Sequence, residues 1–119
     1  MRLGNGKIET YLGFCIRARK IIFGAEMIER QQKGIPLLIV DGSIGKNSLK
    51  TILQVCEKKG CPLYQTDEGT LAEWVHRPAV KAVAVQDKNL AVAIMKESDG
   101  EPRIRLYSGG INSTYGKEI

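Results

Sequence analysis

The sequence predicts an α/β fold, a three-layer α/β/α sandwich built on a small mixed sheet of about four strands. Two short, continuous apolar runs, IPLLIVD at 35–41 and AVKAVAVQD at 79–87, are typical of strands buried on both faces. Segments with apolar residues at helical spacing separate these runs. Strands that alternate with helices in this way form a sheet covered by helices on both sides.

The N-terminal part of the chain predicts two helices. Asn5 is a suitable N-cap for the first, whose apolar residues recur at helical spacing as far as Ile16. A short apolar stretch, IIF, then leads to Gly24. The second helix follows with the sequence AEMIERQQK, in which acids come early and a base comes late, and it ends at Gly34.

The remainder alternates in the same manner. Asn47 or Ser48 can cap a helix that runs to Gly60, and the brief strand PLYQ follows. A short helix around TLAEWVH ends at Pro78, and Asp87 can cap a last core helix.

Length and composition favour one domain with one core. We expect residues 1–98 to form this domain and residues 99–119 to be a C-terminal extension, with an added strand at RIRLY and a loose, Gly-rich tail. Eighteen Lys and Arg against thirteen Asp and Glu give a net charge of +5, which favours an acidic partner. The N-terminus lacks the apolar core of a signal sequence, and no stretch is long enough to span a membrane, so we expect a cytoplasmic protein.

The segment DGSIGKNS invites comparison with a phosphate-binding P-loop, because it follows a strand and precedes a helix. The match fails, since Val40 stands where the first glycine belongs and Asn47 stands where Ser or Thr belongs. Nucleotide hydrolysis is therefore not expected. A loop of this kind, with Lys46, can still hold one backbone phosphate through its amides.

The cysteines and the histidine are not spaced in the sequence as in a catalytic or metal site. Cys15, Cys56 and Cys61 are spaced neither as a zinc site nor as a disulfide framework, and buried thiols are the simpler interpretation. His76 has no obvious nucleophile partner in the sequence. Trp74 suits a core anchor, or a base-stacking platform if it is exposed. We therefore expect no enzyme activity, no cofactor and no metal site.

Four segments carry a family resemblance when they are taken together. RARKIIFGAEMIERQQKG, PLLIVDGS, CEKKGCPLYQ and LAEWVHRPAVKAVAVQDKNLAVAI cover about residues 8–95. They resemble the kink-turn-binding ribosomal protein family of the L-seven-Ae and L-thirty-e type, and most closely its small bacterial YlxQ-like members. The resemblance implies an RNA face that combines the start of the second helix with the loop before the last core strand. Such a face offers amides to phosphates and an apolar support to splayed bases.

The resemblance also carries over individual positions. Gly24 matches the glycine that opens the second helix, Lys20 matches the basic residue of the entry motif, and Arg30 falls where relatives have a lysine. Where strong kink-turn binders have Asn followed by Glu, this chain has Glu26 followed by Met27. That departure removes polar readout and places a carboxylate near phosphates, although YlxQ-like members share a similar pair.

The sequence thus predicts a non-catalytic, ribosome-associated protein that binds structured, kink-turn-like RNA, with ribosome-associated proteins as further partners. Arg17 and Arg19 join the candidates through their charge, although they can equally serve to cap the first helix. The predicted RNA-binding residues are Arg17, Arg19, Lys20, Gly24, Glu26, Arg30, Lys46, His76 and Arg77.

Two alternatives keep the same fold. The first is a protein-interaction module that has lost RNA binding, with an exposed apolar patch around Met27, Trp74 and Val75 as its mark. The second is an accessory domain like the substrate-recruiting domains fused to some RNA methyltransferases, which would need a catalytic partner.

Overall fold

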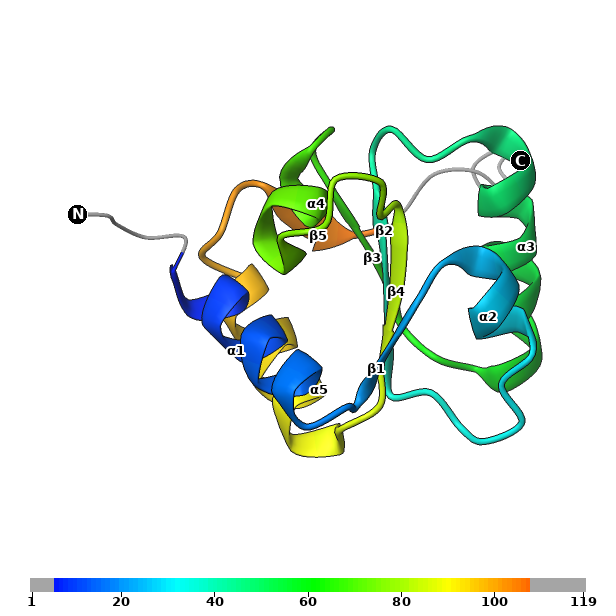
Figure 1. Cartoon of the computed structure of the whole chain (residues 1–119), viewed down its shortest axis with the longest axis horizontal. Helices are drawn as coiled ribbons and strands as arrows, with labels where there is room; N and C mark the ends of the chain where they lie inside the picture. The colour runs from blue at the N-terminus through cyan, green and yellow to red at the C-terminus, as the bar shows by residue number, and fades with distance from the viewer. Residues whose placement is uncertain (1–5, 108–119) are drawn as a thin grey trace.

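A five-stranded mixed sheet forms the middle layer of the protein (Figure 1). The computed structural model describes residues 6–107. The strands are β1 (Ile21–Phe23), β2 (Leu37–Asp41), β3 (Leu63–Thr66), β4 (Ala82–Val85) and β5 (Ile104–Leu106). Their order across the sheet is β1-β4-β2-β3-β5, and only the β2–β3 pair is parallel. The predicted α/β class with a mixed sheet is confirmed, with five strands in place of about four.

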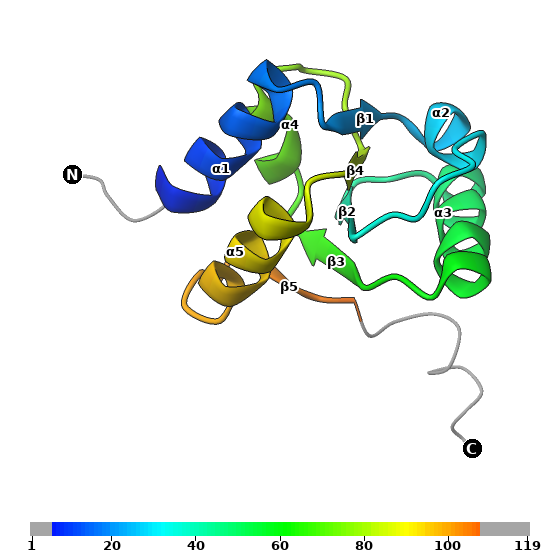
Figure 2. The same ribbon diagram turned by 90° about the horizontal axis from the view of Figure 1, so that it is seen from below.

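Helices cover both faces of this sheet. They are α1 (Gly6–Arg17), α2 (Ala25–Glu29), α3 (Lys46–Lys59), α4 (Thr70–Val75) and α5 (Lys88–Ser98). Helices α1, α4 and α5 lie on one face, and α2 and α3 lie side by side on the other (Figures 1 and 2). Every residue of β2 is buried, because its alternate side chains enter the two layers in turn. Leu37 and Ile39 join the core under α1, whereas Leu38 and Val40 join the core under α3.

Strand β1 is not predicted by the sequence, which indicates only a connection over 21–23. Its three residues are half-buried and pair antiparallel with β4, with Ile22 opposite Ala84. A run of three residues is too short to show the periodicity of a strand. The extended conformation therefore depends on pairing with a neighbour that is distant in sequence.

The predicted boundaries of three helices need correction. Helix α2 ends at Glu29 and does not continue to Gly34, because residues 30–34 supply no buried side chain. Helix α3 begins at Lys46 with Gly45 as its N-cap, so the predicted caps at 47 and 48 lie inside the helix. Helix α4 ends at Val75, and its C-cap His76 has a left-handed φ of 59°, so the helix stops before Pro78.

The late strand lies within the described residues, whereas the predicted N-terminal cap and the tail do not. Strand β5 pairs antiparallel with β3, so the expected late strand is present at the edge of the sheet. The predicted cap Asn5 and the expected tail from residue 108 onward lie beyond the described range. Within 6–107, no helix is both long enough and apolar enough to cross a membrane.

The N-cap of α5 follows the prediction. Asp87 Oδ1 accepts a hydrogen bond from the Leu90 backbone N–H at 2.9 Å. We expect Asp87→Ala to lower the free energy of unfolding by about 1 kcal/mol in urea denaturation, because one N–H of the first turn loses its acceptor. Asp87→Asn is the matched control and should remain near the wild-type value, since Asn caps about as well as Asp. Equal losses in both variants would contradict a capping role.

Candidate functional site

Three hollows adjoin on the face where α1 ends and where α2 and α3 begin. The flanking hollow, of about 440 Å³, lies between α1 and the loop 76–81 and contains Arg17, His76 and Arg77. The central groove, of about 290 Å³, lies between β1, the same loop and the start of α3. The interhelical groove, of about 410 Å³, runs between α2 and α3 and contains Glu26 and Glu29. It shares Gly24, Ala25 and Ser48 with the central groove.

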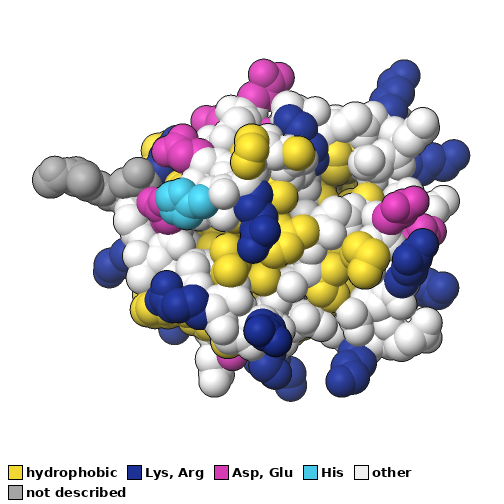
Figure 3. Space-filling view, in the orientation of Figure 1, with side chains coloured by type: hydrophobic (Ala, Val, Ile, Leu, Met, Phe, Trp, Pro, Cys, Tyr) yellow, Lys and Arg dark blue, Asp and Glu magenta, His cyan; other side chains and the backbone are white. Residues whose placement is uncertain are grey.

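The central groove has an apolar floor with an aromatic ring at its edge. Phe23, Ile44 and Val80 are among its lining residues and are half-buried. The Arg77 guanidinium lies over the Phe23 ring, with its central carbon 4.4 Å from the ring centroid. A planar cation stacked on an aromatic ring is a cation–π pair, and both partners present flat surfaces of the kind on which nucleobases stack. Figure 3 shows hydrophobic side chains gathered in the middle of this face, with Lys and Arg side chains around them.

Lys81 is held at the central groove by a chain of hydrogen bonds. Its Nζ donates to Ser43 Oγ at 2.7 Å, and Ser43 Oγ donates in turn to Asp41 Oδ2. Ser43 follows the end of β2 and Lys81 precedes β4, so two neighbouring strands position the pair. The ammonium group is therefore fixed near one position while its remaining protons face solvent.

Asp41 anchors this chain from inside the protein. Its fully buried carboxylate also accepts hydrogen bonds from Thr66 Oγ1 at 2.9 Å and from the backbone N–H groups of Gly69 and Leu71, both at 3.0 Å. Burial by itself would raise the pKa of the Asp41 carboxyl, but the hydrogen bonds from Ser43 and from the backbone outweigh it and lower the pKa to about 2. The group is a carboxylate at neutral pH and ties the end of β2 to β3 and α4.

Close packing beside Asp41 requires a glycine. A Cβ atom at Gly42 would lie 2.8 Å from the Thr66 carbonyl oxygen, closer than a side chain can approach a backbone atom. The chain leaves β2 through this contact and then reaches Ser43. The first glycine of the DGSIGKNS segment, Gly42, therefore allows a tight approach between two backbone segments.

The cations of this face are available to a ligand. None of Arg17, Arg77 and Lys81 forms an ion pair with a carboxylate among residues 6–107. His76 differs, because its Nε2 lies 2.8 Å from Glu9 Oε2. Arg17 and Arg77 at the flanking hollow and Lys81 at the central groove therefore form a surface suited to a polyanion that also carries flat apolar groups.

The predicted candidates are only partly brought together. The fold assembles Arg17, His76 and Arg77 in the flanking hollow and places Gly24 and Glu26 in the interhelical groove. The others do not line the three hollows. Arg19 and Lys20 form the exposed turn that closes α1, Arg30 is the C-cap of α2, and Lys46 is the exposed first residue of α3.

The predicted set lacks Phe23, Ser43 and Lys81, which form the stacked pair and the hydrogen-bonded chain at the central groove. The sequence does single out Lys81, because it is the only charged residue inside the apolar run AVKAVAV. The role of Ser43 depends on a hydrogen bond across 38 residues of sequence, for which the sequence holds no local sign.

The apolar patch that would mark a protein-interaction module does not form. Trp74 is 0% exposed and Val75 is 2% exposed, because α4 turns both side chains into the core. Met27, at 53%, is exposed without them. The expectation of a patch around these three residues is therefore wrong, and the interpretation of Trp74 as a core anchor is confirmed.

All three cysteines lie among the described residues and have raised pKa values. Burial raises the pKa values of Cys15 and Cys61 to about 11, so both thiols remain protonated at neutral pH. Burial also raises the pKa of Cys56, whose Sγ donates to the Cys61 carbonyl oxygen at 2.9 Å. Within 6–107, no three His, Cys, Asp or Glu side chains are grouped closely enough to hold a metal ion.

The fold has a counterpart among solved structures. A protein of unknown function from Bacillus halodurans is similar, with a TM-score of 0.70 and 21% sequence identity, over 78% of this chain and 97% of that one. At this identity the likeness shows the fold alone. No family model and no curated protein matches the sequence.

Proposed function

We propose that this chain is a non-catalytic RNA-binding protein of the cytoplasm, associated with the ribosome, which binds structured, kink-turn-like RNA at the central groove and the flanking hollow. Phosphates would contact Arg17, Arg77 and Lys81, and a splayed base would stack on the Arg77–Phe23 pair. The ribosomal association and the class of RNA rest on the family resemblance.

The observation that carries this proposal is the pairing of fixed cations with an apolar groove. Arg77 is stacked on Phe23 at 4.4 Å, and Lys81 is hydrogen-bonded to Ser43 at 2.7 Å. Cations that are held in place lose less conformational entropy when they bind a phosphate than freely rotating side chains do. A flat apolar floor between them favours a nucleic acid over a simple acidic surface, because bases splayed at an RNA bend need an apolar support.

Glu26 limits the form that binding can take. It lies in the interhelical groove beside Asn47 and Ser48, and not in the central groove. A carboxylate there repels phosphates but can accept hydrogen bonds from base amino groups and from ribose hydroxyls. The backbone of the RNA would therefore follow the cations of the loop 76–81, with base or sugar edges turned toward Glu26.

The test is the salt dependence of RNA binding. The purified protein is titrated with a kink-turn RNA and with bulk ribosomal RNA between about 50 and 200 mM salt. Three phosphate contacts predict that affinity falls by about 40-fold over this range. The double variant Arg77→Ala/Lys81→Ala should bind more weakly, and the slope of log affinity against log salt should decrease in magnitude by about 1.8.

Lys96→Ala provides the matched control, because Lys96 is an exposed lysine on α5 that lines none of the three hollows. Its affinity and slope should equal those of the wild type. The proposal fails if the wild-type protein binds neither RNA, or if the double variant keeps the wild-type slope.

A further inference from the structure

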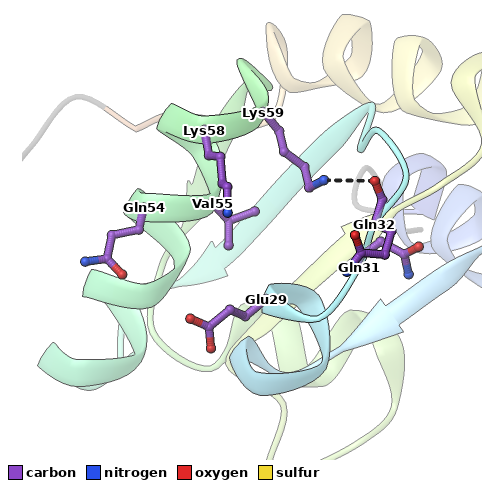
Figure 4. A pocket seen from close by; sticks show the side chains of 7 residues that line it. All are labelled: Glu29, Gln31, Gln32, Gln54, Val55, Lys58 and Lys59. Atoms are coloured by element: carbon purple, nitrogen blue, oxygen red, sulfur yellow. Dashed lines mark hydrogen bonds between the residues drawn. The ribbon is translucent and has the colours of Figure 1, made fainter.

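A fourth hollow, a cleft lined mainly by polar side chains, lies where α2 and α3 end. Its volume is about 280 Å³ (Figure 4). Helix α3 supplies Gln54, Lys58 and Lys59 to one wall, and the end of α2 with the loop after it supplies the other. That second wall consists of Glu29, Gln31 and Gln32.

The two lysines belong to the cleft as well as to the end of the helix. Cations in the last turn of α3 suit the helix dipole, which is a sufficient account of their presence there. Their orientation shows that both side chains also line the cleft. Lys59 Nζ reaches across the cleft to the Gln32 carbonyl oxygen at 3.3 Å, and the Lys58 side chain extends from α3 toward the α2 side (Figure 4). Neither lysine pairs with a carboxylate among the described residues.

The cleft is continuous with the RNA-binding face proposed above. Glu29 lines both the cleft and the interhelical groove, and that groove shares Gly24, Ala25 and Ser48 with the central groove. The hollows thus follow one another along the α2–α3 pair. From Ser48 to Lys58 the helix rises about 15 Å, at 1.5 Å per residue.

The charges alternate along this track. Lys81 lies at its beginning, Glu26 and Glu29 lie in the middle, and Lys58 and Lys59 lie at its end. Carboxylates exclude phosphates but accept hydrogen bonds from ribose hydroxyls and base amino groups, whereas lysines attract phosphates. Glutamine amides at the final cleft can donate to a phosphate or pair with a base edge.

We infer that this cleft is a second RNA subsite, which receives a single strand that leaves the bent RNA core and passes between α2 and α3. Lys58 and Lys59 bind the phosphates of that strand, and Glu26 and Glu29 contact its sugars and bases on the way. This inference rests on the proposed function and extends it from one contact region to two.

The experiment uses a kink-turn RNA with and without a single-stranded extension of six uridines, placed at each end in turn. For the wild-type protein, one of the two extensions should raise affinity by about tenfold and steepen the salt slope by about 1.4, which is the value for two single-strand phosphate contacts. In Lys58→Glu/Lys59→Glu the gain from the extension should disappear, while affinity for the unextended RNA stays unchanged.

Lys50→Glu is the matched control, because Lys50 is an exposed lysine of the same helix that lines neither the cleft nor the grooves. It should keep the full gain, and urea denaturation of both variants checks that they are folded. The inference is overturned if neither extension adds affinity, if the gain persists in the double variant, or if Lys50→Glu abolishes it equally. These outcomes leave the proposed function standing, whereas a wild-type protein that binds no kink-turn RNA overturns both.

Discussion

Replacing Asp41 with Ala should lower the free energy of unfolding by about 3–5 kcal/mol, a large part of the 5–15 kcal/mol typical of a domain. Five hydrogen bonds converge on this carboxylate, from Ser43 N–H and Oγ–H, from Thr66 Oγ1 and from the N–H groups of Gly69 and Leu71. Without the carboxylate, buried donors lose their acceptor and cannot reach water. Each such donor costs about 1–3 kcal/mol.

Urea denaturation followed by circular dichroism measures this loss. Asp67→Ala is the matched control, since Asp67 is exposed and pairs with Arg105 at the surface at 2.8 Å. Exposed ion pairs contribute little, so the control should lose less than about 1 kcal/mol. A loss of that small size in Asp41→Ala would show that the network at the end of β2 does not hold the fold together.

The role of Asp41 can also be tested by measuring how the free energy of unfolding changes at acid pH. The pKa of the Asp41 carboxyl is about 2 in the folded protein against 3.8 ordinarily. Because the folded pKa is the lower one, the stabilisation is fully present above pH 3.8 and is lost as the pH falls toward 2. The shift corresponds to about 2 kcal/mol. Asp41→Asn, which carries no titrating group, should lose this part of the acid dependence, and an unchanged acid dependence would contradict the assignment.

The strongly apolar strands were predictable because burial on two faces leaves a continuous mark in the sequence. All five residues of β2 and all four residues of β4 are buried, and the apolar runs 35–41 and 79–87 predict both strands. The cap at Asp87 was predictable because it acts over three residues. Strand β1 and the early end of α2 were not, since each depends on what the chain packs against rather than on its own periodicity.

The geometry of the site likewise depends on packing between segments that are distant in sequence. Arg17 and Arg77 are 60 positions apart, and only the packing of α1 against α4 brings them into one hollow. The position of Lys81 is set by Ser43, and that of Ser43 by a carboxylate whose other partners lie on β3 and α4. Charge and a family pattern indicate which cations to consider. They do not indicate which cation has a fixed position, because that is decided by contacts between segments far apart in sequence.

Trp74 is buried and therefore cannot contact RNA at the surface. Its replacement gives the second large expected effect on the free energy of unfolding. Trp74→Ala should lower the free energy of unfolding by about 3–5 kcal/mol, because the side chain is fully buried under α1 and leaves a large cavity. The Arg103 guanidinium lies over the ring, with its central carbon 5.2 Å from the centroid, and would lose this contact as well. Urea denaturation followed by circular dichroism measures the change without relying on tryptophan fluorescence.

Trp74→Phe separates the core role from an RNA role. Phe keeps most of the apolar volume and removes an indole Nε1–H that has no hydrogen-bond partner among the described residues, so the expected loss is smaller than in Trp74→Ala. The folded Trp74→Phe variant should bind RNA with wild-type affinity, because the ring does not reach the surface. In Phe23→Leu, by contrast, affinity should fall about tenfold, since the aromatic partner of Arg77 is lost while an apolar side chain remains. A loss of affinity in Trp74→Phe with none in Phe23→Leu would move the base-stacking surface away from the central groove.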